Sequence, residues 1–134
     1  MTLSLSDAVP KRRHRILVVD DEPDIVRALA LRLKSAGYEL LVASDAVQAT
    51  RIAVKEQPDL ILLDIGLPGG DGHTVASRLR ANLKTVNIPL IFLTARSGST
   101  DRQKAQLVAP AGYLIKPYQP EELLRIIEEA LQSG

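Results

Sequence analysis

Four of the five apolar runs in this chain lead into a carboxylate, a hydroxyl or an ammonium group. These groups belong to Asp20 and Asp21, Asp64, Thr94 and Lys116. In an open parallel sheet the carboxyl ends of the strands share one edge, and ligands bind at that edge. We therefore expect three acids, a hydroxyl and a lysine, far apart in the sequence, to meet in one pocket.

These residue types fit the transfer of a phosphoryl group. A carboxylate such as that of Asp64 is a competent nucleophile toward phosphorus. Three close carboxylates repel one another unless a cation lies among them, and Mg²⁺ prefers oxygen ligands. The Lys116 ammonium can pair with a phosphoryl oxygen. Pro117 restricts Lys116 to an extended backbone, which argues against an ordinary surface lysine.

Each residue also has a simpler interpretation when it is taken alone. Asp64 could cap a loop, and Asp21 could cap the helix that begins near Pro23. Thr94 could be an ordinary β-branched strand residue. Only the combination favours phosphoryl chemistry.

Composition narrows the class of protein. The 134 residues suit one domain, with 46 % apolar and 25 % charged residues. Without cysteine there is no disulfide or thiolate site. Residues 1–10 lack an apolar core long enough for a signal peptide, and no apolar run approaches the length of a membrane span, so we expect a cytoplasmic protein. With 3 % aromatic residues and a basic cluster only near the N-terminus, direct nucleic-acid binding is not expected.

Apolar runs alternate with helical patterns, which predicts βα units around a parallel sheet. Residues 1–14 are expected to form a flexible basic arm, and 15–134 one domain. The expected strands cover about 16–20, 39–43, 59–64, 90–94 and 112–115. The expected helices run from Pro23 to before Gly37, from 44 or 45 to 56, over 73–81, from the loop 96–100 to Pro110, and over 120–132. Ile25, Ala28, Leu29 and Leu33 are predicted to face inward from the first helix.

Four motifs give the chain a family resemblance. They are Val18-Val19-Asp20-Asp21-Glu22-Pro23, the segment from Leu63-Asp64 to Asp71-Gly72, Leu93-Thr94-Ala95, and Tyr113-Leu114-Ile115-Lys116-Pro117-Tyr118. From residue 15 to 132 the chain resembles the receiver domain of two-component response regulators, in the single-domain form of chemotaxis regulators. The resemblance implies a doubly wound, flavodoxin-like α/β fold, with a five-stranded parallel sheet of order 2-1-3-4-5 flanked by five helices.

The resemblance also implies roles for the site residues. Asp64 would be phosphorylated by a sensor histidine kinase or a histidine phosphotransfer protein. Mg²⁺ would be bound by Asp21, Asp64 and the Gly66 carbonyl, and by Asp20 through water. Lys116, Thr94 and the backbone N–H of Ala95 would contact the phosphoryl group, and the Lys116–Pro117 bond would be cis.

The resemblance further implies a switch. Thr94 would move toward the phosphoryl group and Tyr113 would rotate into the space behind it. The face formed by the last two helices and the strand 112–115 would then change shape for a downstream protein partner.

The chain would catalyse only its own phosphoryl transfer and slow autodephosphorylation, and would not act as an enzyme on other substrates. It would be a monomer or a weak homodimer through those two helices, with no membrane contact.

Some positions depart from the family pattern or are left without a role. Gly70 replaces a larger apolar residue, and Ala109-Pro110-Ala111 replaces a segment that usually contains acids. Gly66 and Arg96 occupy positions where family members differ and where the difference affects phosphoryl lifetime. His73 belongs to no motif and is predicted to lie on a helix surface.

Two other functions remain open. The first is a phosphohydrolase of the haloacid-dehalogenase type, but the general acid that such enzymes carry two residues after the nucleophile is replaced by Gly66. The second is a docking module that never receives a phosphoryl group. Such modules usually lack one of the acids or the lysine, and all are present here.

Overall fold

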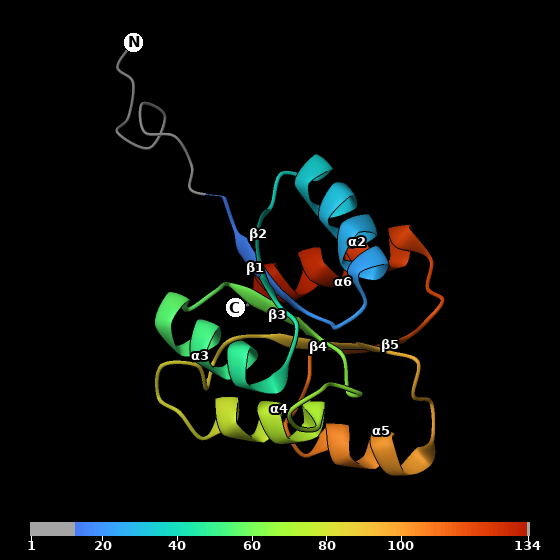
Figure 1. Ribbon diagram of the computed structural model, residues 1–134. Helices are drawn as coiled ribbons and strands as arrows, with labels where there is room; N and C mark the ends of the chain where they lie inside the picture. The colour runs from blue at the N-terminus through green and yellow to red at the C-terminus, as the bar shows by residue number, and fades with distance from the viewer. Residues whose placement is uncertain (1–12, 134) are drawn as a thin grey trace.

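The computed structural model describes residues 13–133, so nearly all of the predicted arm lies outside the described residues. Five strands alternate with five helices (Figure 1). The strands are β1 (Arg15–Val19), β2 (Glu39–Ala43), β3 (Leu60–Leu63), β4 (Leu90–Thr94) and β5 (Gly112–Ile115). The helices are α2 (Pro23–Ser35), α3 (Ala46–Glu56), α4 (Gly72–Arg80), α5 (Ser99–Gln106) and α6 (Pro120–Ser133).

The strands form one parallel sheet in the order β2-β1-β3-β4-β5. Helices α2 and α6 cover one face of the sheet, and α3, α4 and α5 cover the other (Figure 1). This is the predicted doubly wound α/β fold, with β1 and β3 adjacent at the point where the strand order reverses. Ligands of such sheets bind in the crevice outside that point.

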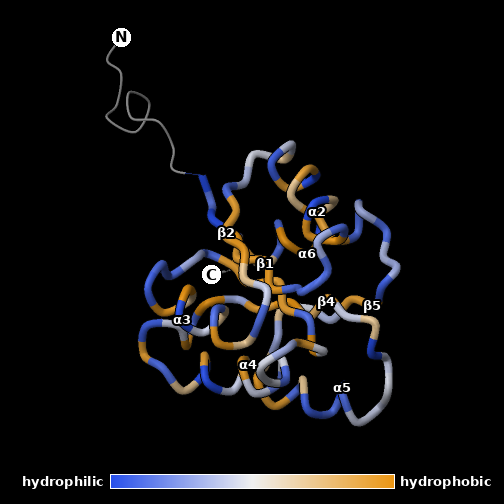
Figure 2. The backbone as a smooth tube through the Cα atoms, viewed as in Figure 1, coloured by the Kyte–Doolittle hydropathy of each residue, from blue (hydrophilic) through white to orange (hydrophobic). Residues whose placement is uncertain are grey.

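The central strands are buried on both faces because their side chains alternate between two cores. In β1, Ile16 and Val18 face the core under α2 and α6, while Leu17 and Val19 face the core under α3, α4 and α5. The strands accordingly form a hydrophobic centre surrounded by more polar helices (Figure 2). The sheet, packed between two cores, therefore fixes the positions of the residues that follow its strands.

Three predictions about the helices need correction. Helix α5 begins at Ser99 and ends at Gln106, well before Pro110, and Ala109 adopts a left-handed φ of 48°. Helix α4 begins at Gly72, one residue earlier than expected, because the Asp71 side chain caps it. Ala28 of α2 is exposed and does not belong to the buried stripe of that helix.

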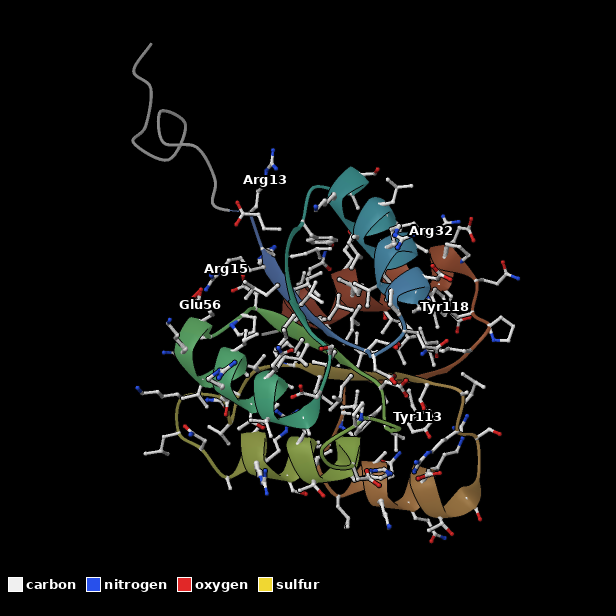
Figure 3. All side chains as sticks on the ribbon, viewed as in Figure 1. Arg13, Arg15, Arg32, Glu56, Tyr113 and Tyr118 are labelled. Atoms are coloured by element: carbon white, nitrogen blue, oxygen red, sulfur yellow. The ribbon has the colours of Figure 1, made fainter. Side chains whose placement is uncertain are left out.

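Two arginines bind backbone groups where elements meet. Arg80 at the end of α4 donates to the carbonyls of Ile88 at 2.7 Å and Val108 at 2.8 Å, which lie before β4 and after α5. Its burial lowers the pKa of the guanidinium. Arg15 of β1 pairs with Glu56 at the end of α3 (Figure 3).

None of the helices in residues 13–133 combines the length and apolar character needed to cross a membrane.

Candidate phosphoryl-acceptor site

The three predicted acids converge at the carboxyl edge of the sheet. Asp20 and Asp21 follow β1 and Asp64 follows β3, and each offers an oxygen that lies within 4.8 Å of the others. Asp20 and Asp64 are buried, whereas Asp21 is exposed. The strands therefore supply a compact acidic cluster that is open to solvent on one side.

Lys116 provides the positive charge opposite this cluster. Its Nζ lies 2.6 Å from Asp20 Oδ2 and 3.2 Å from Asp64 Oδ2. Burial lowers the pKa of Lys116, but the hydrogen bond and charge of Asp20, together with Asp64, outweigh burial and raise the pKa above its ordinary value. The Lys116–Pro117 bond is cis, as the resemblance implied. The lysine is thus a fixed ammonium beside the predicted acceptor.

Thr94 and Ala95 lie where β4 ends, on the neighbouring strand. Thr94 is fully buried, and its hydroxyl oxygen accepts a hydrogen bond from the Arg96 N–H at 3.2 Å, which leaves its own hydrogen free to be donated elsewhere. Ala95 is exposed and lines a pocket together with Lys116 and Pro117. Both residues stand at the edge where their predicted roles require them.

The loop after β3 holds Asp64 by backbone contacts. The Gly66 N–H donates to Asp64 Oδ1 at 3.3 Å, and the Gly72 N–H donates to the Ile65 carbonyl at 2.7 Å. At Gly72 a Cβ would lie 2.3 Å from the Asp64 carbonyl oxygen. Only glycine allows α4 to begin this close to the strand end.

We predict that Gly72→Ala lowers the free energy of unfolding by about 2 kcal/mol, because the backbone carrying Asp64 must move to admit the methyl group. Urea denaturation measures this loss. Gly98→Ala is the matched control, since a Cβ at Gly98 meets nothing within 4 Å, and its cost should stay below about 1 kcal/mol. Equal losses in the two variants would contradict the role given to Gly72.

Tyr113 lies on β5, between the sheet and α5. Its hydroxyl donates to the Arg96 carbonyl at 2.7 Å, its ring centroid is 5.7 Å from that of Phe92, and the Arg102 guanidinium lies 4.9 Å above the ring. Burial, followed by the charge of Asp101, raises the pKa of Tyr113. Tyr118 packs against the opposite core, under α2 and α6 (Figure 3). Tyr113 is thus the tyrosine that connects the site to α5.

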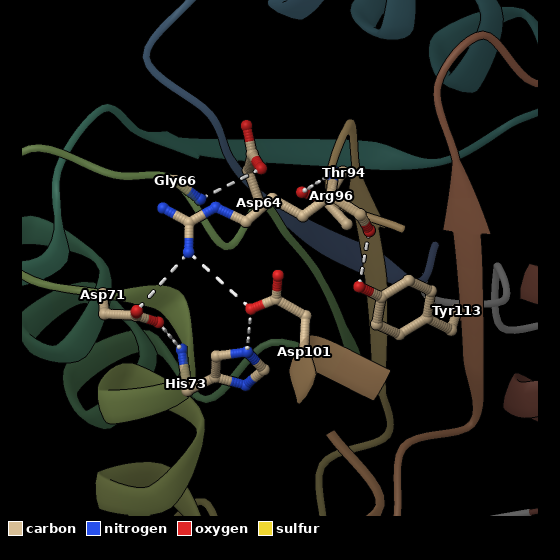
Figure 4. Close-up of polar contacts among 8 residues, drawn as sticks. All are labelled: Asp64, Gly66, Asp71, His73, Thr94, Arg96, Asp101 and Tyr113. Atoms are coloured by element: carbon tan, nitrogen blue, oxygen red, sulfur yellow. Dashed lines mark hydrogen bonds and ion pairs between the residues drawn. The ribbon is translucent and has the colours of Figure 1, made fainter. Parts of the chain in front are cut away.

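The prediction for His73 is wrong. Its side chain is 11 % exposed, its ring lies 5.7 Å from Phe92, and its Nε2 is 3.0 Å from Asp101 Oδ1 (Figure 4). Because α4 starts at Gly72, the second residue of the helix faces α5. Asp101 is 28 residues further along the chain, so no local pattern could indicate this pair.

A family comparison agrees with this geometry. The model of the response regulator receiver domain matches residues 16–128, which include all of the predicted site residues. The chain belongs to the receiver domain family. Receiver domains are the phosphoacceptor modules of two-component signalling.

Relatives of this receiver include full-length regulators. It is 41 % identical over 117 residues to the phosphate regulon transcriptional regulatory protein PhoB of Pseudomonas aeruginosa, covering 87 % of this chain and 51 % of PhoB. It is 39 % identical over 118 residues to the DNA-binding dual master transcriptional regulator RpaA of Synechocystis, covering 88 % and 49 %. The receiver spans about half the length of these curated relatives.

Solved structures of similar proteins share the fold. A CheY-like receiver domain protein from Methanospirillum hungatei has a TM-score of 0.86 at 26 % identity, covering 91 % of this receiver and 96 % of that chain. The receiver domain of the sensor histidine kinase PA1611 from Pseudomonas aeruginosa has a TM-score of 0.83 at 32 % identity, covering 90 % and 99 %. That structure has a magnesium ion coordinated in its active-site cleft.

Proposed function

We propose that this receiver accepts a phosphoryl group on Asp64 and uses it to change the face formed by α5, β5 and α6. The observation that supports this most is the Asp64 carboxylate itself. It is buried, is 3.2 Å from the Lys116 ammonium, and forms a cluster with two further acids. Such a carboxylate has a nucleophilic oxygen and a counter-charge ready for an incoming anion.

The transfer step forms one bond and breaks one. An Asp64 oxygen attacks phosphorus and forms an acyl phosphate, while the bond from phosphorus to the donor's imidazole nitrogen breaks and its electron pair stays on that nitrogen. Lys116, already between Asp20 and Asp64, is close enough to pair with a phosphoryl oxygen after a small movement. The Thr94 hydroxyl and the Ala95 N–H are the proposed donors to the remaining oxygens.

The acidic cluster suits Mg²⁺. It offers carboxylate oxygens from Asp20, Asp21 and Asp64, which are the ligands this ion prefers, and exposed Asp21 leaves room for the waters that the ion retains. We propose Asp21 and Asp64 as direct ligands with the Gly66 carbonyl, and Asp20 as a ligand through water. When bound, the ion neutralises charge that the phosphoryl group brings.

The switch would follow from the contacts of Thr94 and Tyr113. The Thr94 hydroxyl oxygen accepts a hydrogen bond from the Arg96 N–H, and the Tyr113 hydroxyl donates one to the Arg96 carbonyl. Both side chains therefore contact the backbone of one residue in the loop between β4 and α5. A phosphoryl group that draws the Thr94 hydroxyl toward it disturbs this loop and with it Tyr113. Two conformations of the loop would then differ in their affinity for a partner.

The proposed donor is a sensor histidine kinase or a histidine phosphotransfer protein, and the proposed readout is a protein contact on the α5–β5–α6 face. We propose that the receiver catalyses only its own phosphorylation and slow dephosphorylation. The residue two positions after Asp64 is Gly66, which cannot serve as the general acid of a phosphohydrolase.

The proposal is tested with acetyl phosphate as donor, followed by intact-mass spectrometry. We expect a product heavier by one phosphoryl group in the presence of Mg²⁺ and no product in EDTA. Uptake that is equally rapid in EDTA would exclude the proposed metal dependence. An unmodified protein under all conditions, including addition of a histidine-phosphorylated kinase domain, would favour the docking module.

We also predict that Mg²⁺ stabilises the fold through Asp21. At a concentration ten times its Kd, the ion should raise the free energy of unfolding by about 1.4 kcal/mol. Asp21→Ala should remove most of this gain because it deletes an exposed ligand. Thermal or urea denaturation with and without Mg²⁺ measures both. Asp24→Ala, which changes an exposed acid in the first turn of α2, should keep the gain.

A further inference from the structure

The guanidinium of Arg96 lies at the mouth of the proposed acceptor site. Its Nη2 and Nε atoms are 3.6 and 3.7 Å from the position that a Cβ of residue 66 would occupy. The Gly66 N–H in turn contacts Asp64 Oδ1 at 3.3 Å (Figure 4). Residue 66 is a glycine, so it places no side chain between the Arg96 guanidinium and the Asp64 carboxylate.

Two acids outside the site hold this guanidinium. Arg96 Nη1 is 3.7 Å from Asp71 Oδ2 and 3.7 Å from Asp101 Oδ1. Both distances exceed that of a good hydrogen bond, and the arginine side chain is 47 % exposed. Loose, exposed ion pairs of this kind contribute little energy and can be broken by a stronger anion.

These two acids belong to different elements. Asp71 caps α4, where its Oδ1 accepts from the His73 N–H at 2.7 Å. Asp101 lies in the first turn of α5 and also pairs with His73 Nε2. The Arg96 side chain therefore connects the loop after β3 to the start of α5, while its backbone contacts Thr94 and Tyr113.

We propose that Arg96 is a positioning residue for which a phosphoryl group on Asp64 competes with Asp71 and Asp101. This inference rests on the proposed function and adds to it the group that links the acceptor site to α5. A phosphoryl group brings nearly two negative charges and three acceptor oxygens, and arginine binds such a group in bidentate geometry. Withdrawal of the guanidinium from Asp101 leaves the first turn of α5 held by His73 and by the Arg102–Tyr113 contact.

A double-mutant cycle tests the competition. Beryllofluoride with Mg²⁺ serves as the probe, and its apparent affinity is measured for the parent, Asp101→Asn, Arg96→Gln and the double variant. We expect Asp101→Asn to tighten binding by about two- to fivefold in the parent, since one competitor for Arg96 is removed. In the Arg96→Gln background the same change should have no such effect.

The cycle separates this coupling from simple charge repulsion. If Asp101→Asn tightens binding equally with and without Arg96, the acid acts only through its charge and the proposed competition is wrong. Arg125→Gln on α6, which removes another exposed arginine with a carboxylate partner, should leave the affinity unchanged. A parent chain that binds no beryllofluoride would overturn the proposed function together with this inference, whereas binding without coupling overturns the inference alone.

Discussion

Asp64→Asn is expected to abolish phosphoryl uptake from acetyl phosphate, with a loss of at least about a thousandfold in rate. The amide has no anionic oxygen to attack phosphorus, and carboxylate attack is the proposed chemical step. The variant should fold as well as the parent, because asparagine has the shape of aspartate and one negative charge fewer in a crowded acidic cluster. Intact-mass spectrometry measures the uptake, and urea denaturation measures the stability.

Asp45→Asn provides the matched control for this variant. Asp45 follows β2 at the same edge of the sheet, but it caps α3 by accepting from the Gln48 N–H at 2.8 Å. Asparagine caps helices as well as aspartate does. Phosphoryl uptake should therefore match the parent, and stable modification of Asp64→Asn at the parental rate would show that another residue is the acceptor.

Lys116→Met is expected to cost about 3 kcal/mol of unfolding free energy at neutral pH without Mg²⁺. Among residues 13–133, Lys116 is the only basic side chain within 4 Å of the Asp20 and Asp64 carboxylates, so the change leaves both buried acids without a counter-charge. Mg²⁺ should restore more stability to this variant than to the parent, because the ion replaces the missing charge. Lys55→Met, at an exposed position on α3, should change stability by less than about 0.5 kcal/mol.

The alkaline limb of the stability curve tests the same pair. The folded pKa of Lys116 is raised above the unfolded value of 10.5, so its contribution is complete below about pH 10.5 and is lost as pH rises through the folded pKa. The difference in unfolding free energy between parent and Lys116→Met should shrink over that window. Tyr38 and Tyr113 also have raised pKa values, but Lys116 does not act on either, so they cancel in the difference. Burial raises the pKa of Tyr118 and the charge of Lys116 lowers it, so Tyr118→Phe is introduced into both proteins to remove its titration from the comparison. A constant difference up to high pH would contradict the assigned pairing.

The sequence predicted the sheet well because each strand is a short apolar run, and four of the five runs lead into a carboxylate, a hydroxyl or an ammonium group. Three strands, β2, β4 and β5, have the predicted bounds, and the acids after β1 and β3 meet as the parallel arrangement requires. The strand order came from the family resemblance, since periodicity alone does not say which strands are neighbours. The site residues at strand ends were therefore accessible from sequence.

Helix α5 was harder to predict because it contains little hydrophobic pattern. Its sequence is Ser-Thr-Asp-Arg-Gln-Lys-Ala-Gln, and only Ala105 is buried. Pro110 predicts the end of the helix from the sequence, but the helix stops earlier, at Gln106, before the left-handed turn at Ala109. Contacts that depend on the placement of α5 were consequently missed, including the pairing of Asp101 with both His73 and Arg96.

The central claim is that charge added at Asp64 changes the conformation around Tyr113 and α5. The most direct measurement is an NMR titration of the parent chain with beryllofluoride and Mg²⁺, with Asp64→Asn as control. We predict saturable shifts at Asp64 and Thr94 that extend to Tyr113 and to residues 99–106, and none of these in the control. Shifts confined to the strand ends would contradict the switch, and no shifts at all would contradict the acceptor site itself.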